Sequence, residues 1–238
     1  MIDLADETLI REEWTAVDST AELRILFSGG IESAVLMGEA IEAGMEPIPV
    51  YVATGTRWEK TELKSANIYL ETLEVGLSDK MLIRKYIPGD DEKHWAYNKG
   101  GYPLAEDDVQ TLEISGRNET LLREAVRFGE DDRKLILVIG TTADNHFKDG
   151  DRQYFDMMET TLSAQRRSRV TILTPLKGLT KSDVIKRGKR FPLGLTLSCV
   201  APLDGKACGV CIKCASRAAA FLAAEVIDKY EMEELNES

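Results

Sequence analysis

A short apolar run that ends in two glycines is the feature that most limits how this chain can fold. Leu23–Phe27 has the length and hydrophobicity of a strand, and Gly29 and Gly30 follow it at once. Beyond them, apolar residues recur at helical spacing from Ile31 to Ile41. A strand that turns directly into a helix begins a βαβ unit, so the sequence predicts a parallel sheet with right-handed crossovers.

The rest of the chain repeats this alternation of strands and helices. Strands are predicted at 47–53, 81–87, 135–139 and 170–173, and helices at 59–73 and 117–128. The run at 135–139 is apolar throughout, as in parallel strands that are buried on both faces. Thr180 and Asp183 resemble a capping pair for one more helix. The polar stretch from Gly89 to Pro103 is predicted to be a long loop, of the kind that can form a lid.

The segment Ser28–Ser33 carries the first chemical signal. Glycine lets backbone N–H groups come close to a phosphate, and the start of a helix favours an anion. The two serines add hydroxyl donors, and open α/β sheets bind ligands where their strands end. Two adjacent glycines alone would more often form a plain turn. In this strand–turn–helix context, the segment is predicted to bind phosphate.

The four cysteines of the chain fall in one window, which is the second chemical signal. Cys208, Cys211 and Cys214 form Cys-x-x-Cys-x-x-Cys, and Cys199 lies nine residues before Cys208. Four thiolates suit a closed tetrahedral zinc site, and such sites are normally structural. An iron–sulfur cluster and disulfide bonds are the alternatives, although disulfides are rare in cytosolic proteins. We therefore expect zinc to hold the C-terminal segment without taking part in the reaction.

The amino-acid composition of the chain limits the kinds of partner that it can bind. The 30 basic and 41 acidic residues give a net charge of −11, whereas nucleic-acid partners usually require a large cationic face. The local basic cluster that begins at Arg166–Arg169 is expected to be solvated surface. No apolar run is long enough to cross a membrane, and the N-terminus lacks the order of a signal peptide. The sequence predicts a cytoplasmic protein that does not bind nucleic acid.

The two chemical signals together resemble the PP-loop ATP pyrophosphatases, and among them the 7-cyano-7-deazaguanine synthase (QueC) family. The glycine loop is similar to that family's Ser-Gly-Gly-x-Asp-Ser, with Glu32 at the acidic position. The resemblance covers roughly residues 23–222. Besides the cysteines, the matching residues are Gly116, Arg117, Asn118, Gly140, Thr141, Asp144, Arg152, Phe155, Lys181 and Arg217. The chain departs from the family at Trp58, where the family has histidine, and at 147–151.

This resemblance implies a fold and a division of the chain into three parts. The expected fold is a Rossmann-like parallel α/β sheet of the adenine nucleotide alpha hydrolase (PP-loop) type with a C-terminal zinc-binding segment. An N-terminal extension at 1–22, a nucleotide-binding domain at 23–195 and a zinc-binding and helical segment at 196–238 are expected. The resemblance also implies ATP, Mg²⁺ and Zn²⁺ as cofactors, a small deazapurine substrate, and a homodimer.

The resemblance further implies a role for each matching residue. Lys181 and Arg117 would offset charge that develops on the phosphates, and Asp144 would orient the substrate base or Mg²⁺. The metal ligands would be Cys199, Cys208, Cys211 and Cys214. The residues implied to bind ATP or substrate are Phe27, Ser28, Gly29, Gly30, Ile31, Glu32, Ser33, Arg57, Gly116, Asn118, Gly140, Thr141 and Arg152.

The implied reaction uses ATP to adenylate the carboxylate of 7-carboxy-7-deazaguanine and then ammonia to reach 7-cyano-7-deazaguanine. The departures from the family concentrate in the part of the chain that is expected to bind the substrate. A second hypothesis is therefore that the activated carboxylate is joined to another amine. This amine could belong to a protein, for instance in anti-phage defence. A nucleotide sensor without turnover is a third hypothesis. An RNA-thiolating enzyme is a fourth, which the net charge and the grouped cysteines disfavour.

Overall fold

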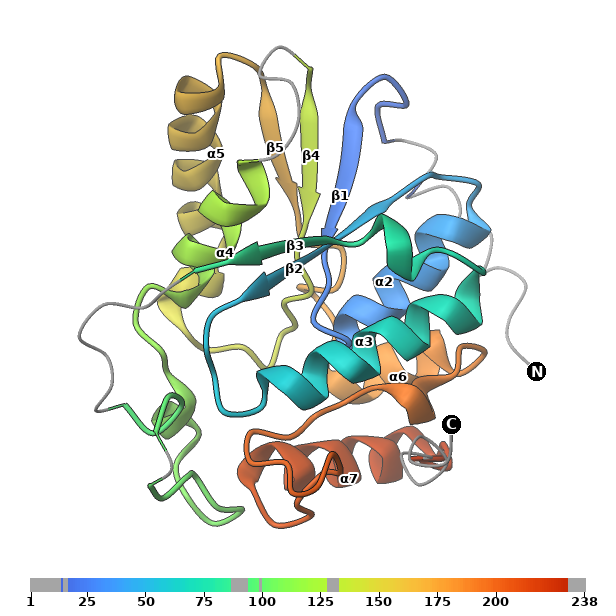
Figure 1. Cartoon of the computed structure of the whole chain (residues 1–238), viewed down its shortest axis with the longest axis vertical. Coiled ribbons are helices and arrows are strands. Elements are labelled where there is room, and N and C mark those ends of the chain that lie inside the picture. The colour runs from blue at the N-terminus through green and yellow to red at the C-terminus, as the bar shows by residue number, and fades with distance from the viewer. Residues whose placement is uncertain (1–13, 15–16, 87–93, 99, 128–132, 231–238) are drawn as a thin grey trace.

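A five-stranded sheet forms the centre of the molecule (Figure 1). The computed structural model describes residues 14, 17–86, 94–98, 100–127 and 133–230. The strands are β1 (Glu22–Leu26), β2 (Ile48–Ala53), β3 (Leu82–Lys85), β4 (Leu135–Val138) and β5 (Val170–Leu173). Their order is β3-β2-β1-β4-β5 and every neighbouring pair is parallel, so the predicted Rossmann-like parallel sheet is confirmed.

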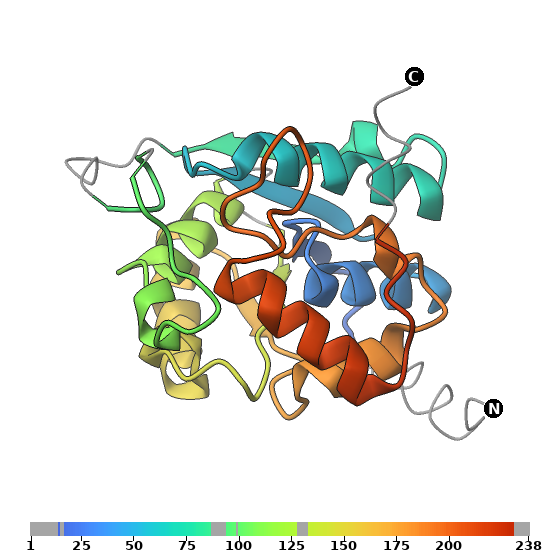
Figure 2. The ribbon, with the colours of Figure 1, turned by 90° about the horizontal axis from the view of Figure 1, so that it is seen from below.

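Helices cover both faces of the sheet. They are α2 (Ile31–Glu42), α3 (Glu59–Leu73), α4 (Arg117–Val126), α5 (Arg152–Arg166), α6 (Lys181–Gly188) and α7 (Ile212–Ala224). Short 3₁₀ turns are η1 (Ser78–Lys80), η3 (Val109–Leu112), η4 (Lys148–Gly150) and η5 (Leu193–Leu195). α4 and α5 pack on one face, α2, α3 and α6 pack on the other, and α7 packs against α6 (Figures 1 and 2).

Side chains along each strand point alternately to the two faces of the sheet, which explains why the molecule has a hydrophobic core on each face. In β4, Ile136 and Val138 join the core beneath α2 and α6, whereas Leu135 and Leu137 join the core beneath α4 and α5. Successive side chains of a strand point to opposite faces, so an uninterrupted apolar run is buried on both. The interpretation of 135–139 as a buried parallel strand is therefore confirmed.

Two predicted elements are shorter in the structure. The helix predicted at 117–128 ends at Val126, and the strand predicted at 81–87 spans Leu82–Lys85. Phe128, Ile87 and Gly89 lie outside the described residues. The same holds for most of the expected N-terminal extension and for 231–238 of the C-terminal segment.

The capping pair predicted before α6 is confirmed. Thr180 Oγ1 accepts from Asp183 N over 3.2 Å, and Thr180 N donates to Asp183 Oδ2 over 3.0 Å. Such a reciprocal pair satisfies two backbone donors at the start of the helix. It also fixes Lys181 as the first residue of α6, at the end of the molecule where the strands end.

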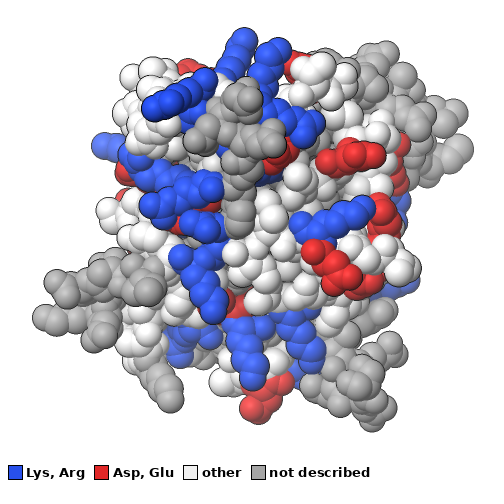
Figure 3. All heavy atoms as spheres, turned by 45° about the horizontal axis from the view of Figure 1, so that its top comes forward, with Lys and Arg blue, Asp and Glu red and all other residues white. Residues whose placement is uncertain are grey.

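Basic side chains gather at the opposite end, where the strands begin (Figure 3). The expectation that the 166–169 cluster is solvated surface holds for Arg167 and Arg169, which are exposed. It is wrong for Arg166, which is 2% exposed and donates to Val126 O over 3.1 Å. The carbonyls left free at the end of α4 explain the difference, because a guanidinium can satisfy them.

Glu39 of α2 is a buried carboxylate, 1% exposed, that ties α2 to α6. Arg187 of α6 donates to its two oxygens over 2.6 and 2.8 Å, and Trp14 Nε1 donates over 3.3 Å. Because breaking a buried pair leaves an unbalanced charge, we expect Arg187→Met to lower the free energy of unfolding by about 3–5 kcal/mol in urea titrations. The control Lys80→Met, which breaks an exposed pair with Glu74, should cost under about 1 kcal/mol. Equal losses in both variants would contradict this prediction.

Candidate active site

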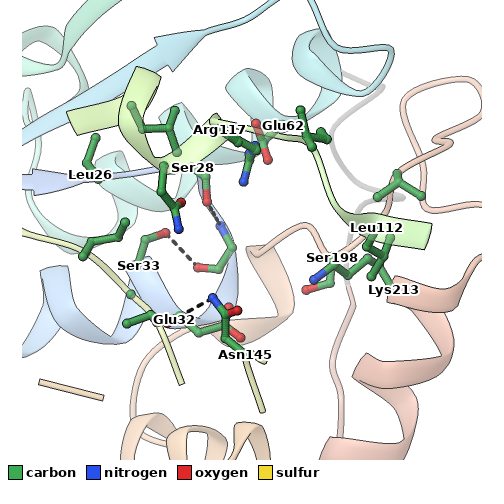
Figure 4. A pocket seen from close by; sticks show the side chains of 18 of the residues that line it. Leu26, Ser28, Glu32, Ser33, Glu62, Leu112, Arg117, Asn145, Ser198 and Lys213 are labelled. Atoms are coloured by element: carbon green, nitrogen blue, oxygen red, sulfur yellow. Dashed lines mark hydrogen bonds between the residues drawn. The ribbon is translucent and has the colours of Figure 1, made fainter. Parts of the chain in front are cut away.

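A cavity of about 440 Å³ lies at the carboxyl ends of the strands (Figure 4). The loops after β1 and β4 both line it. These strands are neighbours, and the order of the sheet reverses at β1, since β2 and β4 lie on either side of it. Open α/β sheets bind their ligands at such a switch point. The position of the cavity therefore follows from the topology of the sheet.

The glycine loop between β1 and α2 has a shape that only glycine permits. Gly29 has a φ of 73°, and a Cβ there would lie 2.9 Å from backbone atoms of Ala66 in α3. Gly30 begins α2 without a side-chain cap, and its N–H donates to Ser28 Oγ over 3.3 Å. Ser33 Oγ donates to Gly30 O over 3.1 Å. An uncapped helix start with hydroxyls beside it suits a phosphate.

Three residues that the resemblance implied for the site meet at this loop. Lys181 Nζ donates to Glu32 Oε1 over 2.7 Å, and Lys181 N donates to Asp144 Oδ2 over 2.6 Å. Burial raises the pKa of Glu32, but the charge and hydrogen bond of Lys181 outweigh it and hold that pKa below its ordinary value. Gly140 lets the β4 loop approach closely, since a Cβ there would lie 2.9 Å from Glu32 Cβ. Lys181 therefore forms an ion pair with Glu32, a residue of the glycine loop itself.

Two further cations reach the cavity and form no ion pair with a carboxylate of the described residues, although Arg117 lies beside Glu62. Arg117 of α4 has a buried Nε that makes no hydrogen bond there. Lys213 of α7 lines the opposite wall, beside Ser198 (Figure 4). Burial lowers the pKa of Lys213 to about 8, and the charge of Lys181 contributes. A buried donor without a partner is costly, so both cations fit an anionic ligand such as the phosphates of ATP.

Lys213 and Glu62 were missed by the sequence reasoning. Glu62 of α3 lines the cavity, and Tyr51 Oη donates to its Oε2 over 2.9 Å. Burial raises the pKa of Glu62 to about 7, against the lowering effects of the Arg117 charge and the Tyr51 hydrogen bond. Neither residue belongs to a motif that was recognised. The only sequence signal for Lys213 is its place between two cysteines.

The cysteine cluster has the geometry of a metal site. The four Sγ atoms lie within 4.8 Å of one another, with Cys211 3.5 Å from Cys214 and 4.0 Å from Cys199. Tetrahedral zinc with bonds of about 2.3 Å places sulfurs about 3.8 Å apart. All four thiols are free, and Cys208 N and Ala201 N donate to Cys199 Sγ over 3.3 and 3.4 Å. A tight set of four sulfurs suits one ion, whereas a cluster with sulfide between its irons needs wider spacing.

The cysteine segment also forms one wall of the cavity. It contributes Leu197, Ser198, Cys199, Val200, Ile212, Lys213 and Ser216. Leu197 N donates to Gly29 O over 3.0 Å, so this segment is bonded directly to the glycine loop. On its other side, Ile212 N donates to Pro103 O over 3.2 Å. The described part of the stretch predicted to be a lid thus packs on the cysteine segment.

Aromatic rings close one side of the cavity. Trp58 stacks on Trp95 with ring centroids 5.7 Å apart and an angle of 28°, and both line the cavity. Trp58 is 5% exposed and packs in the same apolar cluster as the cysteines. Arg217, 5% exposed, holds this region by donating to Thr196 O and Leu193 O and by pairing with Asp228.

Several residues implied by the resemblance do not line the cavity. Arg152 is occupied by Asp156 and Glu159 on its own helix, over 2.7 Å each. Arg57 donates to Gly100 O over 3.0 Å. The other residues that do not line it are two glycines and Ile31. Gly29 and Gly116 shape backbone turns, and Gly116 precedes α4 with a φ of 69°. Ile31 is fully buried. The implied residues that do line the cavity are Phe27, Ser28, Gly30, Glu32, Ser33, Arg117, Asn118, Gly140, Thr141, Asp144 and Lys181.

The parallel sheet, the glycine loop at its switch point and the unpaired cations define a nucleotide-binding α/β protein of the PP-loop type. The family model described as Queuosine biosynthesis protein QueC matches residues 23–225, and the chain belongs to that family. The resemblance stated from the sequence is thereby confirmed.

Relatives of known name agree with the family. The 7-cyano-7-deazaguanine synthase of Chlorobaculum tepidum is 27% identical over 219 residues, covering 88% of this chain and 95% of that protein. The one from Picrophilus torridus is 28% identical over 221 residues, covering 89% and 92%. A solved structure described as a predicted subunit of tRNA methyltransferase from Methanocaldococcus jannaschii has a TM-score of 0.41 and 14% identity, covering 71% of this chain and 74% of that one. So weak a likeness carries no argument. Within the described ranges, no helix is long and apolar enough to span a membrane.

Proposed function

We propose that this chain uses ATP to adenylate the carboxylate of 7-carboxy-7-deazaguanine and converts the activated acid with ammonia to 7-cyano-7-deazaguanine. Membership of the QueC family and the names of the relatives support this proposal. The structural observation that carries it is one cavity that holds the glycine loop together with Arg117 and Lys213, two cations that form no ion pair with a carboxylate of the described residues. Both proposed reactants are anions that such a cavity attracts.

In the first step, the phosphates of ATP would bind at the glycine loop. A carboxylate oxygen of the deazaguanine acid attacks the α-phosphorus, and the bond to the bridging oxygen breaks as pyrophosphate leaves. Lys181 and Arg117 would stabilise the charge that builds up on the phosphate oxygens, because fixed cations in a partly buried site need no reorganisation. Asp144 is exposed at the cavity and accepts only one bond from Lys181 N among the described residues. It is therefore suited to Mg²⁺, which would neutralise the leaving pyrophosphate.

In the second step, ammonia attacks the acyl carbon of the adenylate. The new C–N bond gives an amide, AMP leaves with the electron pair of the acyl–oxygen bond, and one proton is released. A second activation, now at the amide oxygen, followed by loss of AMP and a proton, gives the nitrile. The water-excluding wall of Trp58, Trp95 and the cysteine segment would protect both activated species from hydrolysis.

The zinc assignment and the assembly belong to the same proposal. Zinc on the four cysteines would hold Lys213 and Ser198 in the cavity wall and would take no part in the reaction. A second copy of the chain would cover apolar side chains near α7, where Leu222 is 82% and Ile227 is 81% exposed. We retain the division at 1–22, 23–195 and 196–238, and the cytoplasm, where ATP is available, as parts of this proposal.

The test is product analysis with 7-carboxy-7-deazaguanine, ATP and Mg²⁺, with and without ammonium. We expect AMP and pyrophosphate only when the acid is present, and a nitrile, identified by mass spectrometry, only when ammonium is added. The ratio of pyrophosphate to nitrile gives the number of ATP consumed. AMP without amide or nitrile would indicate another amine as acceptor. No AMP with any acceptor would contradict the proposed activity.

A further inference from the structure

One acidic residue at the cavity accepts no hydrogen bond from a cation or a backbone amide among the described residues, although Arg117 lies beside it. Glu32 is ion-paired with the lysine that begins α6. Asp144 and Asp149 each accept a backbone N–H at the start of a helix, over 2.6 and 3.3 Å. Glu113 is exposed to solvent. Glu62 is partly buried, and the one hydrogen bond that its side chain accepts within the described part of the chain comes from a neutral tyrosine hydroxyl.

The groups that face Glu62 come from three elements. Tyr51 of β2 donates to Oε2 over 2.9 Å, Glu59 lies one turn earlier on α3, and Arg117 of α4 lies beside it (Figure 4). Burial raises the pKa of Glu62 to about 7, Arg117 and Tyr51 lower it, and Glu59 raises it further. A carboxylate with this pKa both accepts and releases a proton near neutral pH, which is what a general base requires.

A negatively charged Glu62 carboxylate is electrostatically unfavourable beside the anionic reactants that this cavity is proposed to bind. ATP, pyrophosphate and the carboxylate of the substrate are all repelled by a negative Glu62, so a role in binding their charged groups is disfavoured. The one proposed reactant that gains from a carboxylate is the amine, which arrives as a cation and must lose a proton to react. Glu62 lines the same cavity as the glycine loop, where the adenylate is proposed to form.

We propose that Glu62 is the proton acceptor for the amine that attacks the acyl adenylate. This inference rests on the proposed function and assigns one of its steps. The ammonium ion first passes one proton to the Glu62 carboxylate, which frees the lone pair of ammonia. Ammonia then forms its bond to the acyl carbon, AMP departs with the electrons of the acyl–oxygen bond, and the second proton that amide formation releases leaves to water. Tyr51 holds the carboxylate in place, and the proton is returned to water after the amide has formed.

The test compares two half-reactions in Glu62→Gln, which keeps the shape and the bond from Tyr51. At pH 7 we expect amide formation from ammonium to fall about 100-fold or more, the usual contribution of a general base. Adenylate formation, measured as ATP–pyrophosphate exchange, should stay within about threefold of the unchanged protein. Hydroxylamine, which is mostly uncharged at this pH, should still give the hydroxamate. Raising the pH should restore amide formation, because free ammonia then becomes abundant.

Glu71→Gln is the matched control, since it makes the same change on α3 at an exposed residue that does not line the cavity. It should leave both half-reactions unchanged. If Glu62→Gln lowers adenylate formation as much as amide formation, Glu62 binds the substrate base or supports the fold, and the inference is wrong. If that variant does not fold, Tyr51→Phe must lower the amide step selectively, or the inference is equally wrong. An unchanged protein that forms no adenylate would overturn the proposed function itself.

Discussion

Replacing Cys214 with serine is expected to lower AMP release at least about 100-fold, although no sulfur takes part in the proposed reaction. A structural zinc ion contributes about 10–16 kcal/mol of apparent binding free energy in small domains, and this energy stabilises the fold around it. Here the fold around the cysteines is a wall of the cavity that carries Lys213 and Ser198. Losing the ion should therefore displace groups that line the site.

Metal content by elemental mass spectrometry, thermal unfolding and AMP release test this prediction together. We expect one zinc ion per chain in the unchanged protein, little in Cys214→Ser, and a lower melting temperature in the variant. Val210→Ser is the control, because Val210 lies between two of the cysteines but is 54% exposed and has no ligand atom. A Cys214→Ser protein that keeps its metal and its activity would show that the cluster is not the zinc site assumed here.

Replacing Lys181 with methionine is expected to lower kcat/KM for AMP formation by a factor of about 10²–10³, the usual effect of removing one donor that stabilises charge in the transition state. The variant loses a cation beside the phosphate loop and leaves Glu32 without its partner at 2.7 Å. Lys177→Met is the control, since Lys177 is close in sequence, donates to Asn145 O and does not line the cavity. AMP formation that survives unchanged in Lys181→Met would rule out this role.

The same pair predicts a pH dependence of stability. Lys181 holds the pKa of Glu32 below its ordinary value of 4.5, so the pair stabilises the fold above that pH. The contribution is lost as the pH falls through the lowered pKa, where Glu32 becomes protonated in the folded protein. Urea unfolding should thus show a stability difference between the unchanged protein and Lys181→Met at pH 7 that shrinks below pH 4.5. A difference that is constant across this range would contradict the assignment.

The elements of the fold could be predicted where local patterns determine them. The apolar run at β4, the Thr180–Asp183 capping pair and the glycines at positions 29 and 30 each have a short-range physical cause that is visible in the sequence. The cysteines could be assigned because their spacing alone suits one ion. The parallel pairing of the strands, and a ligand site after the first strand, followed from the rules for connections in open parallel sheets.

The rest of the site depends on contacts between residues far apart in the chain. Helical periodicity shows that α3 has a buried face, but it does not show that Glu62 on it reaches the same cavity as Lys213 of α7. A match to a family motif likewise does not show which contacts a residue makes. Arg152 matches a residue of the family, yet its ion pairs with Asp156 and Glu159 keep it on the surface of α5. A linear pattern gives the identity of a residue and leaves its partners undetermined.

The hydrogen bond from Leu197 N to Gly29 O has a consequence for how the protein responds to its surroundings. It joins the loop proposed to hold nucleotide to a backbone segment that reaches Cys199, the first of the four clustered cysteines, two residues later. If each ligand orders this shared segment, a coupling free energy connects the two sites, and such coupling is reciprocal. Nucleotide would then raise the affinity for zinc by the same factor by which zinc raises the affinity for nucleotide. A cell short of zinc would retain the active form longest where ATP is plentiful.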